Sequence, residues 1–192
     1  MKGFLTADRL KTFSDSVLLV GEVLLVYNLA TLATSEPEFF EPDTFFHALA
    51  AYISSFIVVF FYWSRFTLLL DHIKSLNDTI IFISLAFLIL VTLTPVSTIG
   101  LLQLKSQMAL IFSSVNQILA GLFLILLWKI LAKDKIFGVK ARYFFLQVCM
   151  IPLIYIAALL VSYLNFTVAL VIPPLSILPI FLLIRFRYGR NL

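Results

Sequence analysis

Long apolar runs separated by short polar segments make up most of this 192-residue chain. A helix that crosses a bilayer needs about 20 mostly apolar residues. Six segments meet that length, at about residues 13–34, 44–66, 77–99, 106–131, 141–163 and 167–185. Each must be helical, because a long apolar run in lipid has no other way to satisfy its backbone hydrogen bonds. The pattern predicts an all-α, polytopic integral membrane protein, with six transmembrane helices in a single domain over residues 1–192.

Prolines and one short polar segment predict where individual helices end, kink or turn. Pro95 is expected to end a helix and Pro152 to kink one, because proline removes a helical hydrogen bond that neighbouring helices can replace. Pro173, Pro174 and Pro179 predict a kinked last helix. The fifth and sixth segments are separated only by a tight turn near Asn165.

Composition agrees with a chain dissolved in lipid. Hydrophobic residues make up 62% of the sequence and mean hydropathy is +1.08, whereas soluble domains are about 45–50% apolar. Charged residues fall to 12%. The apolar stretch near the N-terminus is too long for a cleavable signal peptide and has no Ala-x-Ala-like site after it. We therefore expect it to be retained as the first span.

The basic residues indicate an orientation. With the N-terminus in the cytoplasm, only Lys105 of the 14 Lys and Arg residues falls outside, as the positive-inside rule requires. Both termini are then cytoplasmic, and the net charge of +4 is a topology signal rather than a sign of nucleic-acid binding. The first outer loop, residues 35–43, is acidic. It is either simply solvated or concentrates cations at an outer mouth.

The sequence offers no catalytic or metal-binding constellation. His47 and His72 fall near opposite membrane faces, and no His/Cys cluster, glycine-rich phosphate loop or nucleophile elbow occurs. The single cysteine, Cys149, suits a packing role. We expect no enzyme activity, no cofactor and no metal site. A small membrane protein without such groups more often conducts, transports or assists another membrane protein.

The first predicted helix has two distinct faces. At about 100° per residue, one face changes from apolar to hydroxyl-bearing toward its outer half: Val17, Val20, Leu24, Tyr27, Thr31 and Thr34. A roughly opposite face carries Asp15, Leu18, Glu22 and Leu29. The first face could line a pore, with an apolar constriction below a wetter vestibule. Ordinary helix packing uses the same residue types and remains the alternative.

Charged and polar groups in this helix need an explanation. Glu22 lies two turns inside the apolar stretch, and an ionisable residue at membrane depth is a functional candidate by default. It must be neutral, paired or hydrated, and Asn116 and Gln117 are candidate neighbours by depth. Ser14 or Asp15 could cap a helix start.

Arg9-x-x-x-Phe13-Ser14-Asp15, at the head of the first span, resembles the signature of the transmembrane protein 175 family of potassium channels. The pairs Ser55-Phe56 and Tyr62-Trp63 look like that family's second span, and the run from Phe87 to Thr98 looks like the end of its third. The resemblance covers about the first 100 residues. It implies a bacterial, single-repeat homotetramer in the inner membrane. The first helices of the four subunits then line a pore for K⁺ or other monovalent cations.

The resemblance also implies roles for individual residues. Counted from Asp15, the rings that form the constriction fall on Val20, Leu24 and Tyr27, and Thr31 continues the same pore-lining face. Arg9, Phe13, Ser14 and Asp15 form the family's structural network.

The chain departs from the family at several of these positions. Val20 is smaller than the usual Leu or Ile, Tyr27 replaces an aliphatic residue, and Phe66 stands where the family has His. We therefore expect Arg9 and Asp15 to have other partners, such as Arg65, Asn77 or Asp78.

Three functions follow as hypotheses. The first is a potassium-preferring tetrameric cation channel. The second is a proton channel or proton-coupled transporter that uses Glu22, because a carboxyl group removed from water can exchange its proton near neutral pH. The third is a non-conducting membrane partner protein, in which the stripe of the first helix is a packing seam.

Overall fold

A computed structural model describes residues 6–35, 39–73, 76–104, 106–132 and 140–173. All of the regular secondary structure in these ranges is helical, as expected for an all-α membrane protein. The helices are α1 (Ala7–Ser35), α2 (Pro42–Leu70), α3 (Asp78–Thr92), α4 (Thr94–Leu104), α5 (Gln107–Ala132), α6 (Lys140–Ser162) and α7 (Phe166–Val171).

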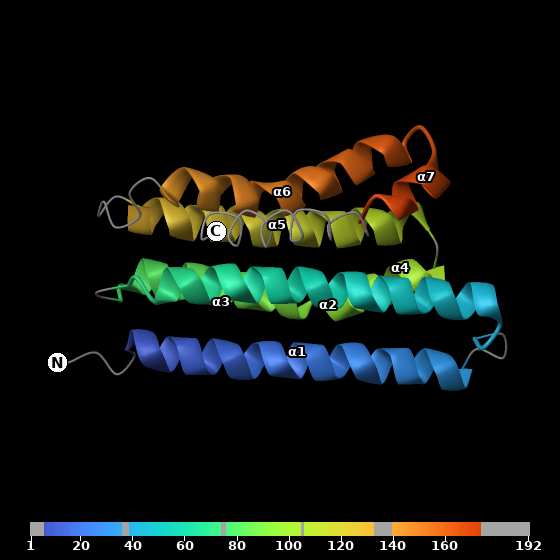
Figure 1. Ribbon diagram of the computed structural model, residues 1–192, viewed down its shortest axis with the longest axis horizontal. Helices are drawn as coiled ribbons and strands as arrows, with labels where there is room; N and C mark the ends of the chain where they lie inside the picture. The colour runs from blue at the N-terminus through green and yellow to red at the C-terminus, as the bar shows by residue number, and fades with distance from the viewer. Residues whose placement is uncertain (1–5, 36–38, 74–75, 105, 133–139, 174–192) are drawn as a thin grey trace, which may run out of the picture.

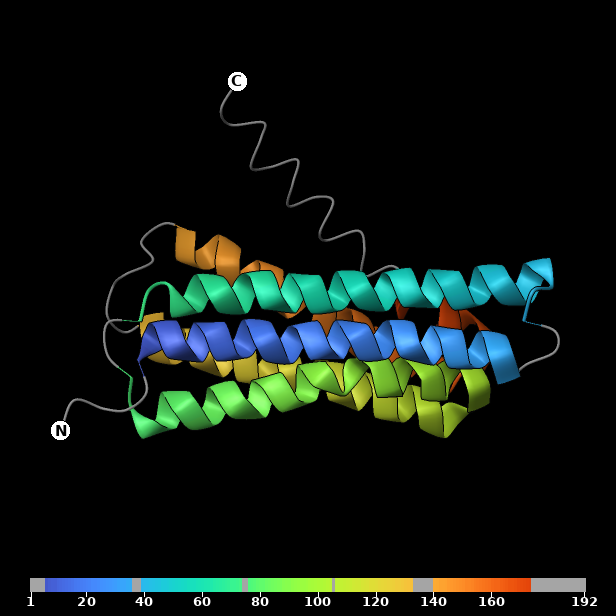
Figure 2. The same ribbon diagram turned by 90° about the horizontal axis from the view of Figure 1, so that it is seen from below.

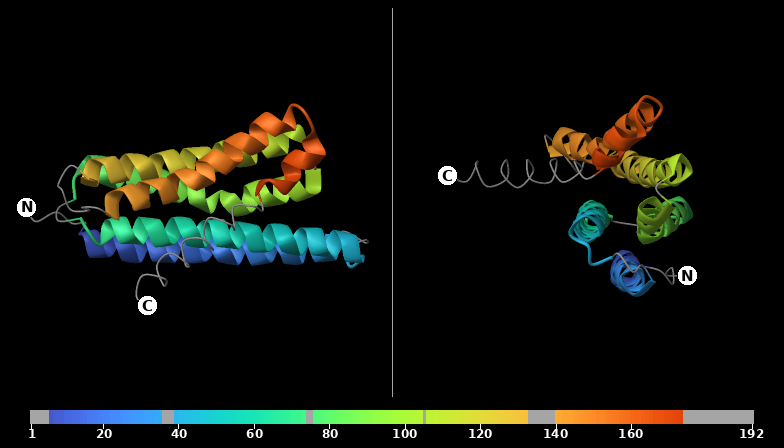
Figure 3. Two further views of the ribbon diagram at one scale, coloured as in Figure 1. Left: turned by 45° about the horizontal axis from the view of Figure 1, so that its top comes forward. Right: turned by 90° about the vertical axis from the view of Figure 1, so that its right-hand side faces the viewer.

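The long helices run side by side along one axis (Figures 1 and 2). Seen from the end, α1 lies at one margin of the bundle, α2 and the α3–α4 pair form the middle, and α5 and α6 lie at the far side (Figure 3). The helix α1 packs on α2, α3 and α4, whereas α5 packs on α3, α4 and α6. The first helix is thus peripheral, with much of its surface turned away from the bundle.

Five helical stretches in the described residues are long and apolar enough to cross a membrane: Ala7–Ser35, Pro42–Leu70, Asp78–Thr98, Gln107–Leu131 and Phe144–Ser162. They match the first five predicted spans, although α1 begins about two turns earlier than expected. The sixth predicted span, 167–185, lies mostly outside the described residues, as do Pro174 and Pro179. Only its first part appears, as the short helix α7.

The third span is broken between α3 and α4. Leu93 ends α3, and Pro95 stands at the second position of α4. This confirms Pro95 as the mark of a helix end, because a proline has no N–H for the preceding turn. The carbonyl groups in the last turn of a helix lack intrahelical donors. One of them, on Leu90, accepts a hydrogen bond from the Asn116 side chain of α5 at 3.0 Å.

A large aromatic and aliphatic core joins the helices. Tyr62, Phe66 and Phe87 are completely buried, and the rings of Phe66 and Phe87 stack with their centroids 4.8 Å apart. Burying such side chains is worth about 1.5–3 kcal/mol each relative to exposure, when the surrounding solvent is water. In lipid the same contacts stabilise chiefly through close packing. This core holds α2, α3, α5 and α6 together and leaves α1 at its edge.

Pro152 lies inside α6, as predicted, and Figure 1 shows the second half of α6 turning away from the line of α5. A Cβ atom on Gly121 of α5 would lie only 2.1 Å from Cγ of Pro152. The glycine therefore permits the two helices to approach at the proline. After α6, Asn165 caps α7 by accepting a hydrogen bond from the Val168 N–H at 3.2 Å, which is the tight turn expected there.

Candidate functional site

The helix α1 has one buried edge, with a spacing of three and four residues. Leu10, Ser14, Leu18, Gly21, Leu25 and Leu32 form this edge. This spacing is that of one helix face turned to a core. Only 22% of the apolar stretch of α1 is buried, against 50% for α5. The rest of α1 must therefore meet lipid or another protein surface.

The predicted stripe lies on the exposed side of α1. Val20 is 59% exposed, Leu24 42% and Tyr27 66%, and Thr31 is also exposed. Val17, which the periodicity assigned to the same face, is half-buried against the core. At a rise of about 1.5 Å per residue, Val20 to Thr31 spans about 16 Å along the helix. The stripe is thus a continuous surface about half a bilayer core long.

The hydroxyl groups at the outer end of the stripe are held by the helix itself. Thr31 Oγ1 donates to the carbonyl of Tyr27 at 3.0 Å. Thr34 Oγ1 lies 3.2 Å from the carbonyl of Ala30 and 3.0 Å from that of Thr31. A threonine whose proton is engaged in this way presents only acceptor lone pairs outward. This end of the stripe is therefore suited to contact a cation or water.

A cluster of polar contacts ties the N-terminal part of α1 to α2. Asp15 Oδ1 accepts a hydrogen bond from Trp63 Nε1 at 2.8 Å. One turn earlier, Lys11 Nζ lies 2.6 Å from Asp71 Oδ1, just beyond the end of α2. Ser14 is completely buried and its hydroxyl donates to the carbonyl of Lys11 at 2.7 Å. The Trp63 and Asp71 contacts join α1 to the second span, whereas the Ser14 bond lies within α1.

The other predicted members of the network are more exposed. Phe13 is 49% exposed, and the backbone N–H of Arg9 donates to Thr6 Oγ1 at 3.3 Å. Since α1 begins at Ala7, Ser14 and Asp15 lie within the helix and neither of them caps it.

Two of the expected partners of Arg9 and Asp15 make other contacts. Arg65 donates to Gln147 Oε1 at 2.7 Å and lies over the ring of Phe61. Asn77 caps α3 by accepting from the Ile80 N–H at 2.8 Å.

Glu22 is half-buried, on the side of α1 away from the stripe. Among the described residues, its buried Oε2 atom has no hydrogen-bond partner. Asn116 and Gln117, expected as its neighbours by depth, instead serve the α3–α4 break. Gln117 Nε2 donates to Thr94 Oγ1 at 2.9 Å, beside the contact of Asn116 with Leu90 described above.

The two histidines lie at opposite ends of the second span, His47 near the start of α2 and His72 just beyond its end. His72 Nδ1 is 2.7 Å from the carbonyl of Leu68. No group of three or more His, Cys, Asp or Glu residues that could hold a metal ion occurs in the described part of the chain. The exposed stripe of α1 and the contacts beneath it are thus the strongest candidate site.

The sequence alone did not indicate the Lys11–Asp71 pair or Trp63 as the partner of Asp15. Both contacts depend on the register of two antiparallel helices. The Tyr62-Trp63 pair on the second span was the one available signal, as part of the family resemblance.

Comparisons with known proteins relate the N-terminal half of the chain to a family of potassium channels. Residues 9–95 match the family described as endosomal/lysosomal potassium channel TMEM175. A potassium channel of Chryseobacterium sp. (strain P1-3) is 32% identical over 94 residues, which are 49% of this chain and 48% of that protein. The matched region thus spans about half the length of this curated relative.

The fold has a solved counterpart. The crystal structure of a lysosomal potassium-selective channel TMEM175 homolog from Chamaesiphon minutus matches with a TM-score of 0.75 at 18% identity. The match covers 93% of this chain and 97% of that one. At this identity the likeness bears on the fold, which extends over almost the whole chain.

Proposed function

We propose that the chain, whose residues 9–95 match the TMEM175 family, is a potassium-preferring cation channel of that family rather than an enzyme. In this proposal four copies assemble around an axis lined by α1. The observation that carries it is the exposed stripe of Val20, Leu24, Tyr27 and Thr31 on the least buried of the five spans. Such a surface on a peripheral helix can be covered by the same helix of other copies.

Closed rotational symmetry makes each exposed residue into a ring. Four copies of Val20 and four of Leu24 form two apolar rings about 6 Å apart along the axis, given the helical rise. Apolar constrictions resist wetting and can gate a pore in that way. Potassium ions lose their hydration water at lower cost than sodium ions, so a narrow apolar passage favours K⁺.

Polar groups flank the rings on the outer side. Thr31, whose hydroxyl proton is engaged with the backbone, offers oxygen lone pairs to a cation that leaves or enters the constriction. Glu41 and Asp43 lie exposed at the start of α2, in the expected acidic outer loop. In the proposed orientation, with the N-terminus in the cytoplasm of a bacterial cell, these carboxylates raise the local cation concentration outside.

The contacts of Lys11 and Asp15 then act as a clamp. They join α1 to α2 at the cytoplasmic end, one to three turns below Val20. A pore lined by rings of side chains requires such a constraint. If α1 rotated about its own axis by the angle between successive residues, about 100°, Val20 would no longer face the pore axis. In this proposal Asp15 and Ser14 set the geometry and do not touch the ion.

Flux measurements in proteoliposomes test the proposal. Val20→Trp and Leu24→Trp fill the axis and should reduce K⁺ flux at least tenfold, while the proteins still elute as the wild-type oligomer. Val26→Trp is the matched control, since Val26 is 53% exposed on the same helix but lies about 130° away from the stripe. Its flux should stay within about twofold of wild type. Robust flux in both stripe variants, or equal loss in the control, would exclude the stripe as the pore lining.

A further inference from the structure

Two polar side chains in the apolar part of α1 have no partner within the subunit. Tyr27 and Asn28 stand between Leu24 and Leu32, and neither side chain hydrogen-bonds to any residue that the structure describes. By contrast, every serine and threonine hydroxyl of α1 from Thr12 to Thr34 bonds to a backbone carbonyl of the same helix. In lipid a polar group without a partner is costly. Tyr27 and Asn28 therefore need a partner from outside the subunit.

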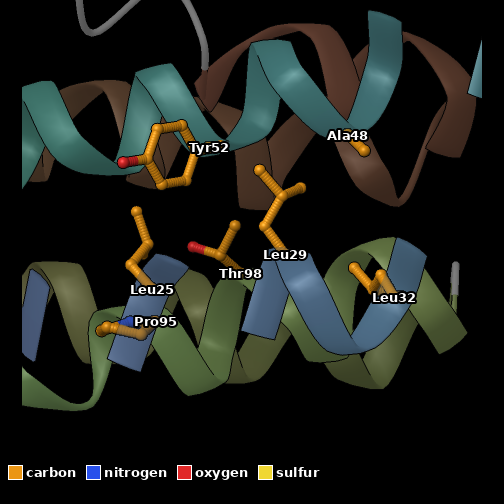
Figure 4. A pocket seen from close by; sticks show the side chains of 7 residues that line it. All are labelled: Leu25, Leu29, Leu32, Ala48, Tyr52, Pro95 and Thr98. Carbon is orange, nitrogen blue, oxygen red and sulfur yellow. The ribbon is translucent and has the colours of Figure 1, made fainter. Parts of the chain in front are cut away.

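Both side chains are accessible at the surface of the subunit. Tyr27 is 66% exposed, and the amide atoms of the half-buried Asn28 also reach the surface. The packing of α1 within the subunit uses another side of the same turns. Figure 4 shows Leu25 and Leu29 extending from α1 toward the side of α2 that carries Tyr52, and residues of α4 close the same space. Tyr27 and Asn28 thus remain available to a second chain.

The two residues lie on opposite sides of the stripe. Successive residues of a helix point about 100° apart, and neighbours in sequence do not face each other on its surface, so Tyr27 and Asn28 of one subunit cannot pair. Relative to the centre of the stripe, Tyr27 lies about 30° to one side and Asn28 about 70° to the other. Their depths along α1 differ by only about 1.5 Å, one helical rise.

Assembly around α1 brings these two sides together. When four α1 helices surround one axis with their stripes turned inward, each interface is heterologous, and one side of every stripe meets the other side of the next. The Tyr27 side of one subunit accordingly faces the Asn28 side of its neighbour at the same depth. A phenol hydroxyl can donate to an amide oxygen, so the two groups are complementary.

We propose that the Tyr27 hydroxyl of each subunit donates a hydrogen bond to the Asn28 side chain of the next, and that four such bonds close the ring of α1 helices. The partner is a second copy of this chain, and the inference rests on the assembly around α1 proposed above. The bond holds each tyrosine ring along the wall of the pore, about 4.5 Å outside the ring of Leu24 side chains. Tyr27 and Asn28 thereby determine which faces of α1 neighbouring subunits share.

Conservative variants of the full chain test the bond. Tyr27→Phe removes only the hydroxyl group, and Asn28→Leu replaces the amide by an apolar group of similar size. A hydrogen bond between helices in a membrane changes an equilibrium constant about threefold, so the loss of four should raise the dissociation constant of the tetramer about 80-fold. The readout is the number of fluorescently labelled chains per complex, counted by photobleaching in liposomes as the protein is diluted with lipid.

Combining the two substitutions in one chain should add little. Each single variant already removes all four bonds, so the double variant should dissociate about as readily as either single variant, and the effects should not be additive.

A mixture of the two single variants gives a sharper test. When Tyr27→Phe and Asn28→Leu subunits alternate around the ring, every second interface keeps both natural side chains. Two of the four bonds are then restored, and the mixture should assemble about tenfold more tightly than either variant alone. A role of either residue in the folding of its own subunit would give no such recovery.

Tyr163→Phe is the matched control, because Tyr163 is 71% exposed just beyond the end of α6, and it should leave the dissociation constant unchanged. A Tyr27→Phe chain that assembles as tightly as wild type, or a mixture that gains nothing, would overturn the bond. The assembly around α1 would still stand in that case if Val20→Trp and Leu24→Trp block flux. A wild-type chain that stays monomeric would overturn both.

Discussion

The indole N–H of Trp63 donates to the carboxylate of Asp15 across 2.8 Å, and this bond joins α2 to α1 about one and a half turns below Val20. Trp63 also lies beside Phe60, with the ring centroids 5.6 Å apart. Asp15 therefore meets a donor held by the packing of α2. The proposed pore lining takes its orientation from this contact and from the neighbouring Lys11–Asp71 pair.

Removing the donor should weaken the docking of α1. We expect Trp63→Phe to lower the free energy of unfolding by about 1 kcal/mol, the usual net value of one hydrogen bond. Asp15→Asn keeps an acceptor oxygen and should lose less. Unfolding by sodium dodecyl sulfate in mixed micelles measures both. If Trp63→Phe is as stable as wild type, the bond does not contribute to docking.

A methyl group at Gly121 should disrupt the contact of α5 with α6. Its Cβ would lie 2.1 Å from Cγ and 2.9 Å from Cδ of Pro152, and the pyrrolidine ring cannot rotate away because it is part of the backbone. Overpacking of this kind costs about 1–3 kcal/mol, so Gly121→Ala should lower the thermal midpoint clearly.

The chain supplies a matched control for that substitution. A Cβ on Gly100 of α4 would meet nothing within 4 Å. Gly100→Ala should therefore be neutral, or stabilise by up to about 1 kcal/mol through helix propensity. If both substitutions destabilise the protein equally, the close contact of α5 with Pro152 is not the cause of the destabilisation by Gly121→Ala.

The buried side chains of Gln117 and Thr94, which are hydrogen-bonded at the α3–α4 break, should contribute to stability as a coupled pair. Thr94→Val removes the acceptor of Gln117 Nε2 and leaves a buried donor without a partner, at a cost of about 1–3 kcal/mol. Thr94→Val combined with Gln117→Leu should cost less than the sum of the single substitutions. Strict additivity in unfolding measurements would contradict the coupling.

A polar residue in the proposed constriction should change conduction in a definite direction. Leu24→Ser replaces an apolar ring by hydroxyl groups, which makes wetting easier. We expect K⁺ flux to rise and the preference for K⁺ over Na⁺ to fall, measured with both ions in the same proteoliposomes. An unchanged preference for K⁺ over Na⁺ would show that Leu24 does not line the narrowest part of the pore.

Periodicity placed Val20, Leu24, Tyr27 and Thr31 on one face of α1, because a helix brings residues three and four apart to one side whatever surrounds it. In the structure this face is exposed, although Val17, assigned to the same face, is half-buried. The same reasoning placed Leu18 and Glu22 on the roughly opposite face, where Leu18 is buried and Glu22 half-buried. Proline chemistry predicted the end of α3 near Pro95 and the position of Pro152 within α6. These features depend only on neighbouring residues in the chain.

Contacts between helices were harder to predict. Depth in the membrane suggested Asn116 and Gln117 as neighbours of Glu22, but α5 turns them toward Leu90 and Thr94. Depth does not determine which way a helix face points. The partner of Asp15 likewise depends on the antiparallel register of α1 and α2, which a hydrophobic pattern does not specify.

Assembly of four copies with α1 at the axis can be seen in a cryo-electron microscopy structure of the protein in lipid nanodiscs. We expect a four-fold symmetric tetramer in which the side chains of Val20, Leu24 and Tyr27 from all subunits face one another across the axis. A monomer or dimer, or a tetramer whose axis is lined by another helix, would exclude α1 as the lining of a four-fold pore.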